Sequence, residues 1–391
     1  MKNETTAPSP IDRMIDFLTT HYAFRYNTVM NCTEYRPVDS PVGSFEPLDL
    51  RTRRRIILEV QREGMEVSQN DIRNYIDSDY VRQYDPIGDY LAECEGVWDG
   101  HDHIGDLART VPTDTPLWRE WFTTWLLAMV SQWQNQSSRL YGNSVAPLLI
   151  SPQGYNKSTF CRRLLPDALK WGYTDSLALS DRRQVMLAMS QQLLINLDEF
   201  NQISPRVQQG FLKNIIQLPS VKVKRPFGTH IEELPRKASF IATSNMTDIL
   251  ADPSGNRRFI GIELTAPIDT SRVPDHRQLF AQALQLLRNG RRSWFDKVET
   301  EQIMLWNRRY EIQEPADQYF SLCFSVAADP LDPAAEWLST AEIFDVIKQK
   351  VGSSLKANTL IAFGRKLANM PDMRRRKCET CTRYLVKRVG Q

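Results

Sequence analysis

A lysine followed by two hydroxyl residues closes a segment that could bind phosphate. Residues 148–160 read LLISPQGYNKSTF, and the end of this segment is similar to the phosphate-loop pattern G-x-x-x-x-G-K-[ST]. In that pattern the backbone N–H groups of a glycine-rich loop surround the phosphates, and the lysine reaches the outer ones. Ser151 and Asn156 stand at the two glycine positions here. The segment alone leaves two interpretations open: a nucleoside triphosphate site, or an ordinary strand, turn and helix.

The local pattern predicts the geometry that an anion site needs. A strand ending at Ile150, a turn containing Gly154 and a helix starting near Lys157 would aim helix N-terminal amides at an anion. Asn156 belongs to a residue type that tolerates a left-handed backbone, whereas Ser151 places a side chain at the loop entrance. If the site binds a nucleotide, its contacts come from Gly154, Tyr155, Asn156, Lys157, Ser158 and Thr159.

An acidic pair follows the next apolar run. QQLLINLDEF places Asp198 and Glu199 after a buried-strand pattern, about forty residues beyond Lys157. A carboxylate at the end of a strand can hold Mg²⁺, and its neighbour can polarise an attacking water. Taken alone, the pair is explained more simply by a strand that runs into an acid-capped helix. Its spacing from the Lys157-Ser158 pair favours the nucleotide interpretation.

Two more polar elements lie at the ends of apolar runs. ASFIATSN ends at Asn245, an amide suited to orient a water or to contact a γ-phosphate, although Thr-Ser-Asn alone is ordinary turn chemistry. DPSGNRRFIGIEL then places Arg257 and Arg258 just before a strand. An arginine there could stabilise phosphate charge in a neighbouring subunit's site. A surface ion pair is the alternative.

The order of these four elements resembles the virulence-associated E (VirE) family, relatives of the superfamily 3 helicases within the AAA+ ATPases. The resemblance covers about residues 20–265 and rests on the motifs YDPIGDYL, WDGHDHI, QGYNKST, NLDEF and DPSGNRRF. It implies an α/β fold with an AAA+-type P-loop NTPase core that uses ATP and Mg²⁺. It also implies a homo-oligomer, typically a hexameric ring, with DNA in its channel.

The same resemblance implies a role for each residue of the site. Lys157 would contact the β- and γ-phosphates, and Ser158 and Asp198 would hold Mg²⁺. Glu199 would be the catalytic base and Asn245 the sensor.

In the resemblance, Arg258, with Arg257 as its rival, would reach in trans into the neighbouring site. The departures at Ser151 and Asn156 bear on nucleotide affinity and hydrolysis rate rather than on the residues that do the chemistry.

The hydrophobic pattern divides the chain into five segments. They are an N-terminal helical or mixed module (1–85), a helical collar (86–143), an ATPase core (144–265), a helical linker or lid (266–315) and a winged-helix-like module (316–391). The core strands are expected in SVAPLLI, QLLINLDEF, ASFIATSN and RFIGIEL. Further helices are expected at 69–82, capped by Ser68 or Asn70, at 116–135, at 341–350 and at 358–368, with a basic hairpin at 374–389.

Two basic segments are candidate DNA contacts. VKVKRPFGTHIEELPRK, residues 221–237, alternates apolar and basic residues, and in the related helicases a hairpin at this place carries basic residues into the ring channel. Its candidate phosphate contacts are Lys222, Lys224, Arg225 and His230, with Phe227 packing on sugar or base. In the tail, the candidates are Arg374, Arg375, Arg376 and Lys377. Solvated surface charge is the alternative for both segments.

The sequence evidence for metal sites is weaker than that for the nucleotide and DNA sites. Cys378 and Cys381 form one C-x-x-C without a second pair nearby, so we do not expect zinc there. His101 and His103 could bind a metal with neighbouring aspartates, but an exposed polar turn explains them more simply. The aromatic-rich stretch WREWFTTWLLAMVSQW is assigned to packing rather than to a cofactor.

The overall composition limits the class of protein. The formal net charge of the 391 residues is only +2, so affinity for nucleic acid must come from local clusters. Scattered cysteines and a polar N-terminus predict a cytoplasmic protein without a signal peptide, and no apolar run is long enough to span a membrane.

We therefore predict a Mg²⁺-dependent ATPase of superfamily 3 helicase type that translocates on or unwinds DNA in the replication of a mobile element or phage. Single-stranded DNA would occupy the ring channel. The alternative is a nucleotide-regulated DNA-binding or assembly factor, of origin or phage-defence type, that does not unwind. Because no primase-like acidic domain is evident, priming would come from a separate primase or replication protein.

Overall fold

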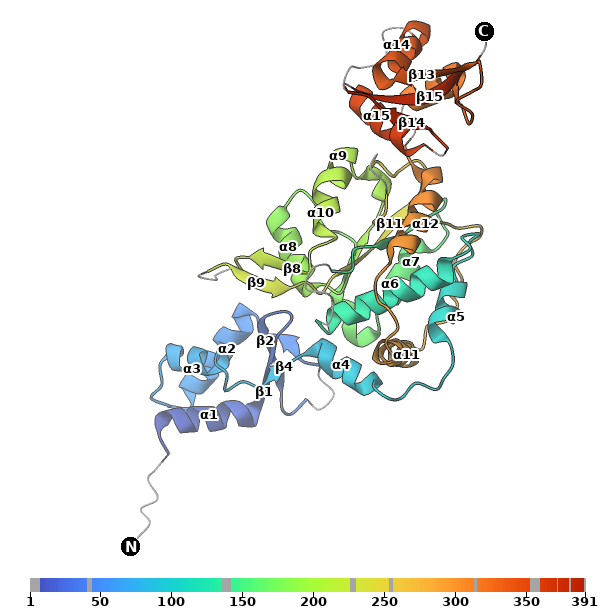
Figure 1. Ribbon diagram of the computed structural model, residues 1–391. Coiled ribbons are helices and arrows are strands. Elements are labelled where there is room, and N and C mark those ends of the chain that lie inside the picture. Colours follow the sequence, from blue (N-terminus) through green and yellow to red (C-terminus); the bar gives the residue numbers. More distant parts are fainter. Residues whose placement is uncertain are drawn as a thin grey trace.

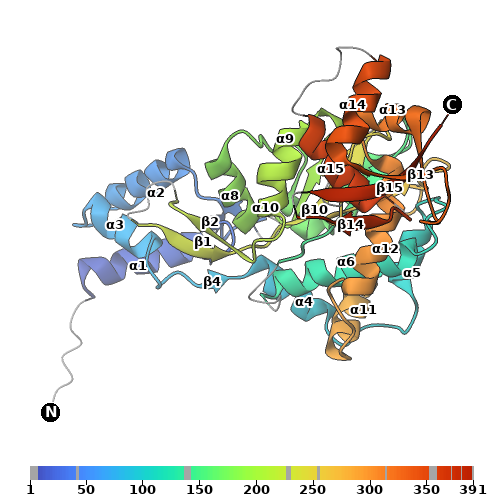
Figure 2. The same ribbon diagram turned by 45° about the horizontal axis from the view of Figure 1, so that its top comes forward.

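The computed structural model consists of three parts arranged in a row (Figure 1). It describes residues 8–40, 44–135, 142–225, 230–252, 256–312, 315–351, 359–370, 372–379 and 381–389. The N-terminal and C-terminal modules lie on either side of a central α/β core, and the two ends of the chain lie far apart in both views (Figures 1 and 2). The mixed α/β fold class expected from the pattern is confirmed.

The N-terminal module combines three helices with a small sheet. Its helices are α1 (Pro10–His21), α2 (Leu50–Arg62) and α3 (Gln69–Ile76). Its strands are β1 (Tyr22–Asn27), β2 (Cys32–Pro37), β3 (Glu46–Pro47) and β4 (Gln83–Tyr84), in the order β3-β2-β1-β4. Ser68 caps α3 in a capping box with Asp71, as one of the two expected caps. The helix stops at Ile76, short of the expected end at 82.

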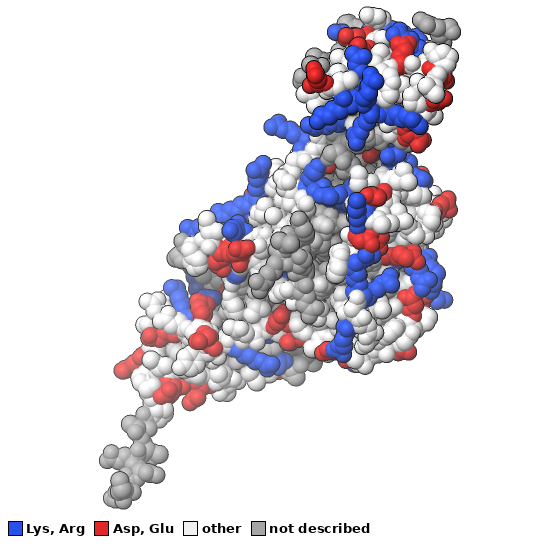
Figure 3. All heavy atoms as spheres, viewed as in Figure 1, with Lys and Arg blue, Asp and Glu red and all other residues white. Residues whose placement is uncertain are grey.

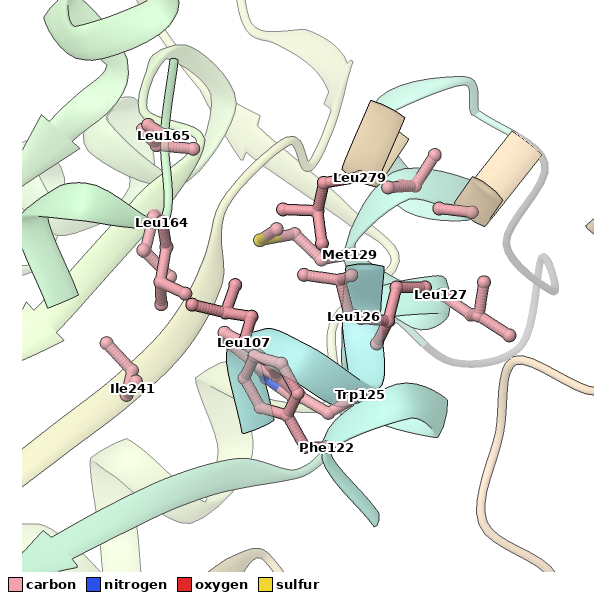
Figure 4. Packing of buried hydrophobic residues seen from close by; sticks show 14 of the residues in the cluster. Leu107, Phe122, Trp125, Leu126, Leu127, Met129, Leu164, Leu165, Ile241 and Leu279 are labelled. Carbon is pink, nitrogen blue, oxygen red and sulfur yellow. The ribbon is translucent and has the colours of Figure 1, made fainter. Parts of the chain in front are cut away.

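Three helices join this module to the core: α4 (Pro86–Cys94), α5 (His103–Arg109) and α6 (Trp118–Trp133). α6 is buried on nearly every side, so it has no polar face. In Figure 4, Phe122, Trp125 and Met129 of α6 meet Leu107 of α5 and Leu279 of a later helix. The aromatic-rich stretch therefore packs inside its own chain, which is one of the two kinds of packing, core or inter-subunit, that its sequence allows.

The core is built on a five-stranded sheet in the order β11-β5-β10-β7-β6, with every pair parallel. Its strands are β5 (Ala146–Ile150), β6 (Tyr173–Thr174), β7 (Leu194–Leu197), β10 (Ser239–Ser244) and β11 (Phe259–Glu263). Four of them fall in the expected apolar runs, and the two-residue β6 is too short to leave a pattern. Because all strands are parallel, their carboxyl ends share one edge.

Helices and short helical turns cover the sheet. They are α7 (Lys157–Arg163), η1 (Asp167–Gly172), α8 (Arg182–Gln191), η2 (Phe200–Gln202), α9 (Pro205–Val207), the π-helical turn η3 (Gln208–Leu212) and α10 (Lys213–Ile215). The antiparallel strands β8 (Ser220–Val223) and β9 (Glu232–Pro235) form the expected hairpin, which lies beside the N-terminal module in both views (Figures 1 and 2). Residues 226–229 between these strands, including Phe227, lie outside the described residues.

After the sheet come α11 (His276–Arg288), α12 (Lys297–Asn307) and the turn η4 (Arg308–Tyr310). Asn307 accepts a hydrogen bond from the N–H of Gly261 at 3.0 Å, and Trp306 donates to the Gly261 carbonyl at 2.9 Å. A Cβ at Gly261 would lie 2.2 Å from the ring of Tyr310. The missing side chain on β11 therefore allows α12 and its turn to pack against the sheet.

The C-terminal module contains the two expected helices and the expected hairpin. Its elements are α13 (Pro315–Cys323), β12 (Phe324–Val326), β13 (Ala335–Ser339), α14 (Thr340–Val351), α15 (Thr359–Asn369), β14 (Arg375–Lys377) and β15 (Thr382–Arg388). β15 pairs with β13 along one side, and with β14 and β12 along the other. A separate apolar cluster holds the helices against one face of this sheet. Among the helices of the described residues, none is long and apolar enough to cross a membrane.

Replacing Gly261 with alanine is expected to lower the free energy of unfolding by about 1–3 kcal/mol, because the added methyl group overlaps Tyr310. Gly210→Ala is the control, because no atom lies within 4 Å of the Cβ that it adds. The melting temperatures of both variants, followed by circular dichroism, test this. Equal melting of Gly261→Ala and the wild type would contradict the described packing.

Candidate active site

The carboxyl edge of the core sheet gathers three motifs that are far apart in the sequence. β5 leads into the loop before Lys157, and β7 ends just before Asp198. β10 lies between these strands and ends just before Asn245. The Lys157 Nζ donates to the Asn245 Oδ1 at 3.0 Å, and the Ser158 hydroxyl donates to Asp198 at 3.2 Å. The edge therefore holds a cation, a hydroxyl, a carboxylate and an amide in contact.

The loop between β5 and α7 has two left-handed residues. Gly154 has φ +83° and Asn156 has φ +61°, so the expectation that Asn156 tolerates this conformation is confirmed. The Asn156 side chain also donates to the Ile268 carbonyl at 3.1 Å, and the Ile268 N–H donates to the Tyr155 carbonyl at 3.2 Å. The loop is therefore tied to the segment that follows β11.

Lys157 is buried, and its ammonium group is fully hydrogen-bonded. Four oxygens share its three N–H groups: the Ser151 carbonyl at 2.7 Å, the Ser151 hydroxyl at 2.9 Å, the Pro152 carbonyl at 2.9 Å and the Asn245 Oδ1 at 3.0 Å. Burial lowers the pKa of Lys157, and the nearby charge of Asp198 opposes that shift. Ser151, which stands where a glycine is usual, thus supplies two of the acceptors that hold the lysine.

Asp198 receives hydrogen bonds from two hydroxyl groups, those of Ser158 and Thr243. Thr243 is buried on β10 and was not among the expected site residues. The signal that could have found it is its position two residues before Asn245, which puts both side chains on one side of the strand. A carboxylate beside a hydroxyl oxygen is the kind of ligand pair that Mg²⁺ accepts.

Glu199 has a left-handed backbone, with φ +50° and ψ +49°. This conformation is unfavourable for a residue other than glycine and costs about 1–3 kcal/mol. The Glu199 side chain is exposed at the sheet edge and accepts a hydrogen bond from Gln202. The strained backbone holds a second carboxylate beside Asp198 without burying it.

The two candidate arginines point to different environments. Arg257 is exposed, whereas Arg258 is only 8% exposed. Burial lowers the pKa of Arg258, with a further contribution from the charge of Arg257. Arg257 is therefore the side chain of the pair that can reach another molecule, although the family pattern favoured Arg258.

A cavity of about 730 Å³ lies beside α7. Phe160 and Arg163 of α7 line one side of it, Thr110 and Pro112 another, and the segment 266–275 a third. This cavity could not be predicted from the sequence, because its walls come from three separated segments. Its volume is in the range of cavities that hold small molecules.

Residues 91–312, more than half of the chain, match the family model described as the virulence-associated protein E-like domain. The chain belongs to this family. No curated protein matches it. It is similar to the apo structure of the NrS-1 C-terminal region (305–718), with 12% identity, 98% of this chain and 100% of that chain covered, and a TM-score of 0.51. The A form apo structure of the same NrS-1 region gives the same identity and coverage and a TM-score of 0.50.

The matched region of this virulence-associated protein E-like chain includes all the site residues described above. At 12% identity, the likeness to NrS-1 shows a shared fold and nothing about chemistry.

The β8–β9 hairpin presents its cations unevenly. Lys222 and Lys224 are exposed, and the ion pair between Lys222 and Glu233 is long at 3.9 Å. The Arg225 side chain is only 18% exposed, pairs with Glu232 at 3.2 Å and lines a cavity shared with Thr28 of the N-terminal module. His230 is exposed just before β9. Lys222 and Lys224 therefore face solvent, whereas Arg225 faces the N-terminal module.

The tail candidates Arg374, Arg375, Arg376 and Lys377 are all exposed. Cys378 and Cys381 close the hairpin, with the Cys378 N–H donating to the Cys381 carbonyl at 2.8 Å, and neither forms a disulfide. Within the described part of the chain, no group of three or more His, Cys, Asp or Glu residues is arranged to hold a metal ion.

The two histidines of the WDGHDHI motif contact aspartates. His101 lies 2.5 Å from Asp106, and His103 lies 3.0 Å from Asp99. These contacts fit the polar turn that the sequence favours over a metal site.

Asn156→Ala is expected to destabilise the fold by about 1–2 kcal/mol, because alanine lacks the tolerance of asparagine for the left-handed backbone. Asn156→Gly is the matched variant, which keeps that conformation and loses only the hydrogen bond to Ile268. Melting temperatures should fall further for the alanine variant than for the glycine variant. The reverse order would show that the hydrogen bond, and not the backbone, makes this position depend on asparagine.

Proposed function

We propose that this protein is a Mg²⁺-dependent ATPase of the superfamily 3 helicase type, with an AAA+ P-loop core. One observation carries the proposal: the contacts Lys157–Asn245 and Ser158–Asp198 unite three separate motifs at one sheet edge. Each motif alone has an ordinary structural explanation. A single explanation that accounts for both contacts is a site that holds phosphates and a metal ion.

The topology supports a phosphate site at this edge. The segment from β5 to α7 is a strand, a loop and a helix, the arrangement in which P-loops place phosphates against helix N-terminal amides. In parallel α/β sheets, ligands bind at the carboxyl ends of the strands. The left-handed residues Gly154 and Asn156 give the loop the curvature that such an anion cradle needs.

In the proposed reaction, Lys157 exchanges its loop acceptors for oxygens of the β- and γ-phosphates. Ser158 and Asp198 would hold Mg²⁺, which would neutralise charge on the phosphates. Thr243 keeps the Asp198 carboxylate directed toward Ser158. Glu199 accepts a proton from the attacking water.

Two further residues complete the proposed site. Asn245 orients the water or the γ-phosphate, and Arg257 enters the site of the next subunit to stabilise transition-state charge. The cavity beside α7, of about 730 Å³, is large enough for the base and ribose. It also borders the helix that begins at Lys157.

The proposed assembly is a homo-oligomeric ring, as in the family that the motifs resemble, with six subunits as the expected number. Single-stranded DNA would pass through its channel and contact the exposed Lys222 and Lys224 of the hairpin. The activity that fits this ring and its channel is translocation on DNA or unwinding of DNA. It would act in the cytoplasm, during the replication of a mobile element or phage, with a separate primase.

Steady-state ATP hydrolysis with and without single-stranded DNA tests the proposal. Lys157→Ala should abolish activity, and Glu199→Gln should stop turnover while keeping ATP binding, because the lysine binds phosphate and the glutamate acts only in catalysis. Arg257→Ala should lose at least about 10³-fold in turnover. Mixing Glu199→Gln with Arg257→Ala should restore part of the activity, because a mixed ring contains sites with intact residues from both subunits.

Unrestored activity in the mixture would contradict shared sites. No turnover by the wild type, despite ATP binding and DNA binding, would favour a nucleotide-regulated DNA-binding or assembly factor without unwinding. The hydrogen bonds from Lys157 to Ser151 are the observation that favours this second function, because they compete with phosphate for the lysine.

Ser151→Ala should tighten ATP binding by up to about tenfold, because it removes one of the four oxygens that compete with phosphate for Lys157 in the nucleotide-free loop, and one full hydrogen bond is worth about 0.5–1.5 kcal/mol. Ser151→Thr, which keeps the hydroxyl, is the control and should bind like the wild type. Titration with a fluorescent ATP analogue measures both. Weaker binding by Ser151→Ala would show that the hydroxyl serves the bound state instead.

A further inference from the structure

The sheet of the C-terminal module has one face covered by helices and one face turned away from them. Tyr384 and Val386 of β15 belong to the apolar cluster beneath α13, α14 and α15. Arg383 and Leu385 alternate with them and therefore lie on the opposite face, where Arg383 is partly exposed and Leu385 is fully buried. Strand register places Arg376 of β14 opposite Arg383, and Trp337 of β13 opposite Leu385. We call the face with Trp337, Arg376 and Arg383 the outer face.

Cations accumulate on this hairpin without ion-pair partners. Arg374, Arg375, Arg376 and Lys377 are exposed, and none forms an ion pair within the part of the chain that the structure describes. At the other end of β15, Lys387 and Arg388 pair with Asp332 and Glu336. In Figure 3, Lys and Arg side chains gather on the side of this module that is turned toward the core. The hairpin is thus strongly positive in a chain with a net charge of only +2.

Arg376 and Arg383 face each other directly across two strands. Like charges in this arrangement are unfavourable, and the Glu342 carboxylate, whose pKa is lowered by hydrogen bonds from Ser339 and in small part by Arg383, offsets only part of this charge. Arg383 donates to the Trp337 carbonyl at 3.3 Å, and the Arg376 guanidinium lies 5.1 Å from the centre of the Trp337 ring. An anion bound between the two arginines would relieve their repulsion.

We propose that the outer face binds single-stranded nucleic acid. Arg374, Arg376 and Arg383 contact phosphates, and an unpaired base stacks on Trp337. Charge complementarity identifies a polyanion, and the half-buried indole identifies one with exposed planar groups. A duplex fits this face less well, because its bases are stacked inside and α15, a helix that could enter a groove, packs on the other face.

The site is separate from the proposed ATPase site and from the β8–β9 hairpin. It lies beyond residue 312, where the family match ends. Binding there requires no nucleotide, so its test does not depend on ATP hydrolysis.

The test measures the binding of a fluorescent oligothymidine to the full chain without ATP, over a range of salt concentrations. Lys222→Gln/Lys224→Gln serves as the background, to remove the core hairpin. In that background, Arg374→Gln/Arg376→Gln should weaken binding and reduce the slope of log K against log salt by about 1.4, since each phosphate contact on single strands contributes about 0.7. Arg375→Gln/Lys377→Gln is the charge-matched control on the same strand, and its slope should stay close to that of the background.

Trp337→Leu tests base stacking separately from charge, because it changes no charged residue. It should weaken oligothymidine binding about 5- to 100-fold, as expected for the loss of one stacked base, and leave heparin binding unchanged. Trp337→Phe should restore most of the affinity. Equal effects of the two arginine pairs, unchanged binding by Trp337→Leu, or equal affinity for duplex and single strand would each overturn the proposal.

Discussion

The position of β10 between β5 and β7 is the constraint on which the rest of the site depends. Its parallel register with both neighbours places Thr243 and Asn245 between the lysine loop and the acidic pair. Thr243 then holds Asp198, and Asn245 holds Lys157. A register shift of one residue would turn both side chains to the opposite side of the sheet. One buried strand thus fixes the relative position of a cation and an anion that belong to distant parts of the chain.

Several groups at this edge are unfavourable by themselves. Lys157 loses water on burial, and Asn156 and Glu199 adopt left-handed backbones. Such costs persist only where the surrounding structure leaves no alternative conformation. That constraint comes from two apolar clusters. The cluster around α6 reaches Leu149 and Ile241 of the sheet. The second cluster holds Leu197 and Phe200, which flank the acidic pair.

The parts of the fold that can be predicted are those with a strong local signal in the sequence. Continuous apolar runs mark the four long core strands, and their order was enough to propose that distant motifs meet. The left-handed Asn156 could be expected because asparagine tolerates that backbone. Burial of Arg258 beside an exposed Arg257 could not be expected, since both precede β11 and no pattern shows which side chain turns inward. The cavity beside α7 and the inward turn of Arg225 also could not be predicted from the sequence, because each depends on contacts between separated segments.

The near-neutral net charge conceals two different uses of cations. Around the core, Arg225 and Lys213 are tied to Glu232 and Asp252, so these charges support the fold. On the C-terminal hairpin, the consecutive cations at 374–377 form no ion pair within the described residues, and their field reaches only about 8–10 Å at physiological salt. Single-stranded nucleic acid bound there cannot be steered electrostatically to the core over a longer distance. The short connection between the two parts would instead raise the local concentration of that strand near the core, as for any two sites on one tether. On the proposed functions, loading of nucleic acid and ATP-dependent movement would therefore be coupled by chain geometry rather than by charge.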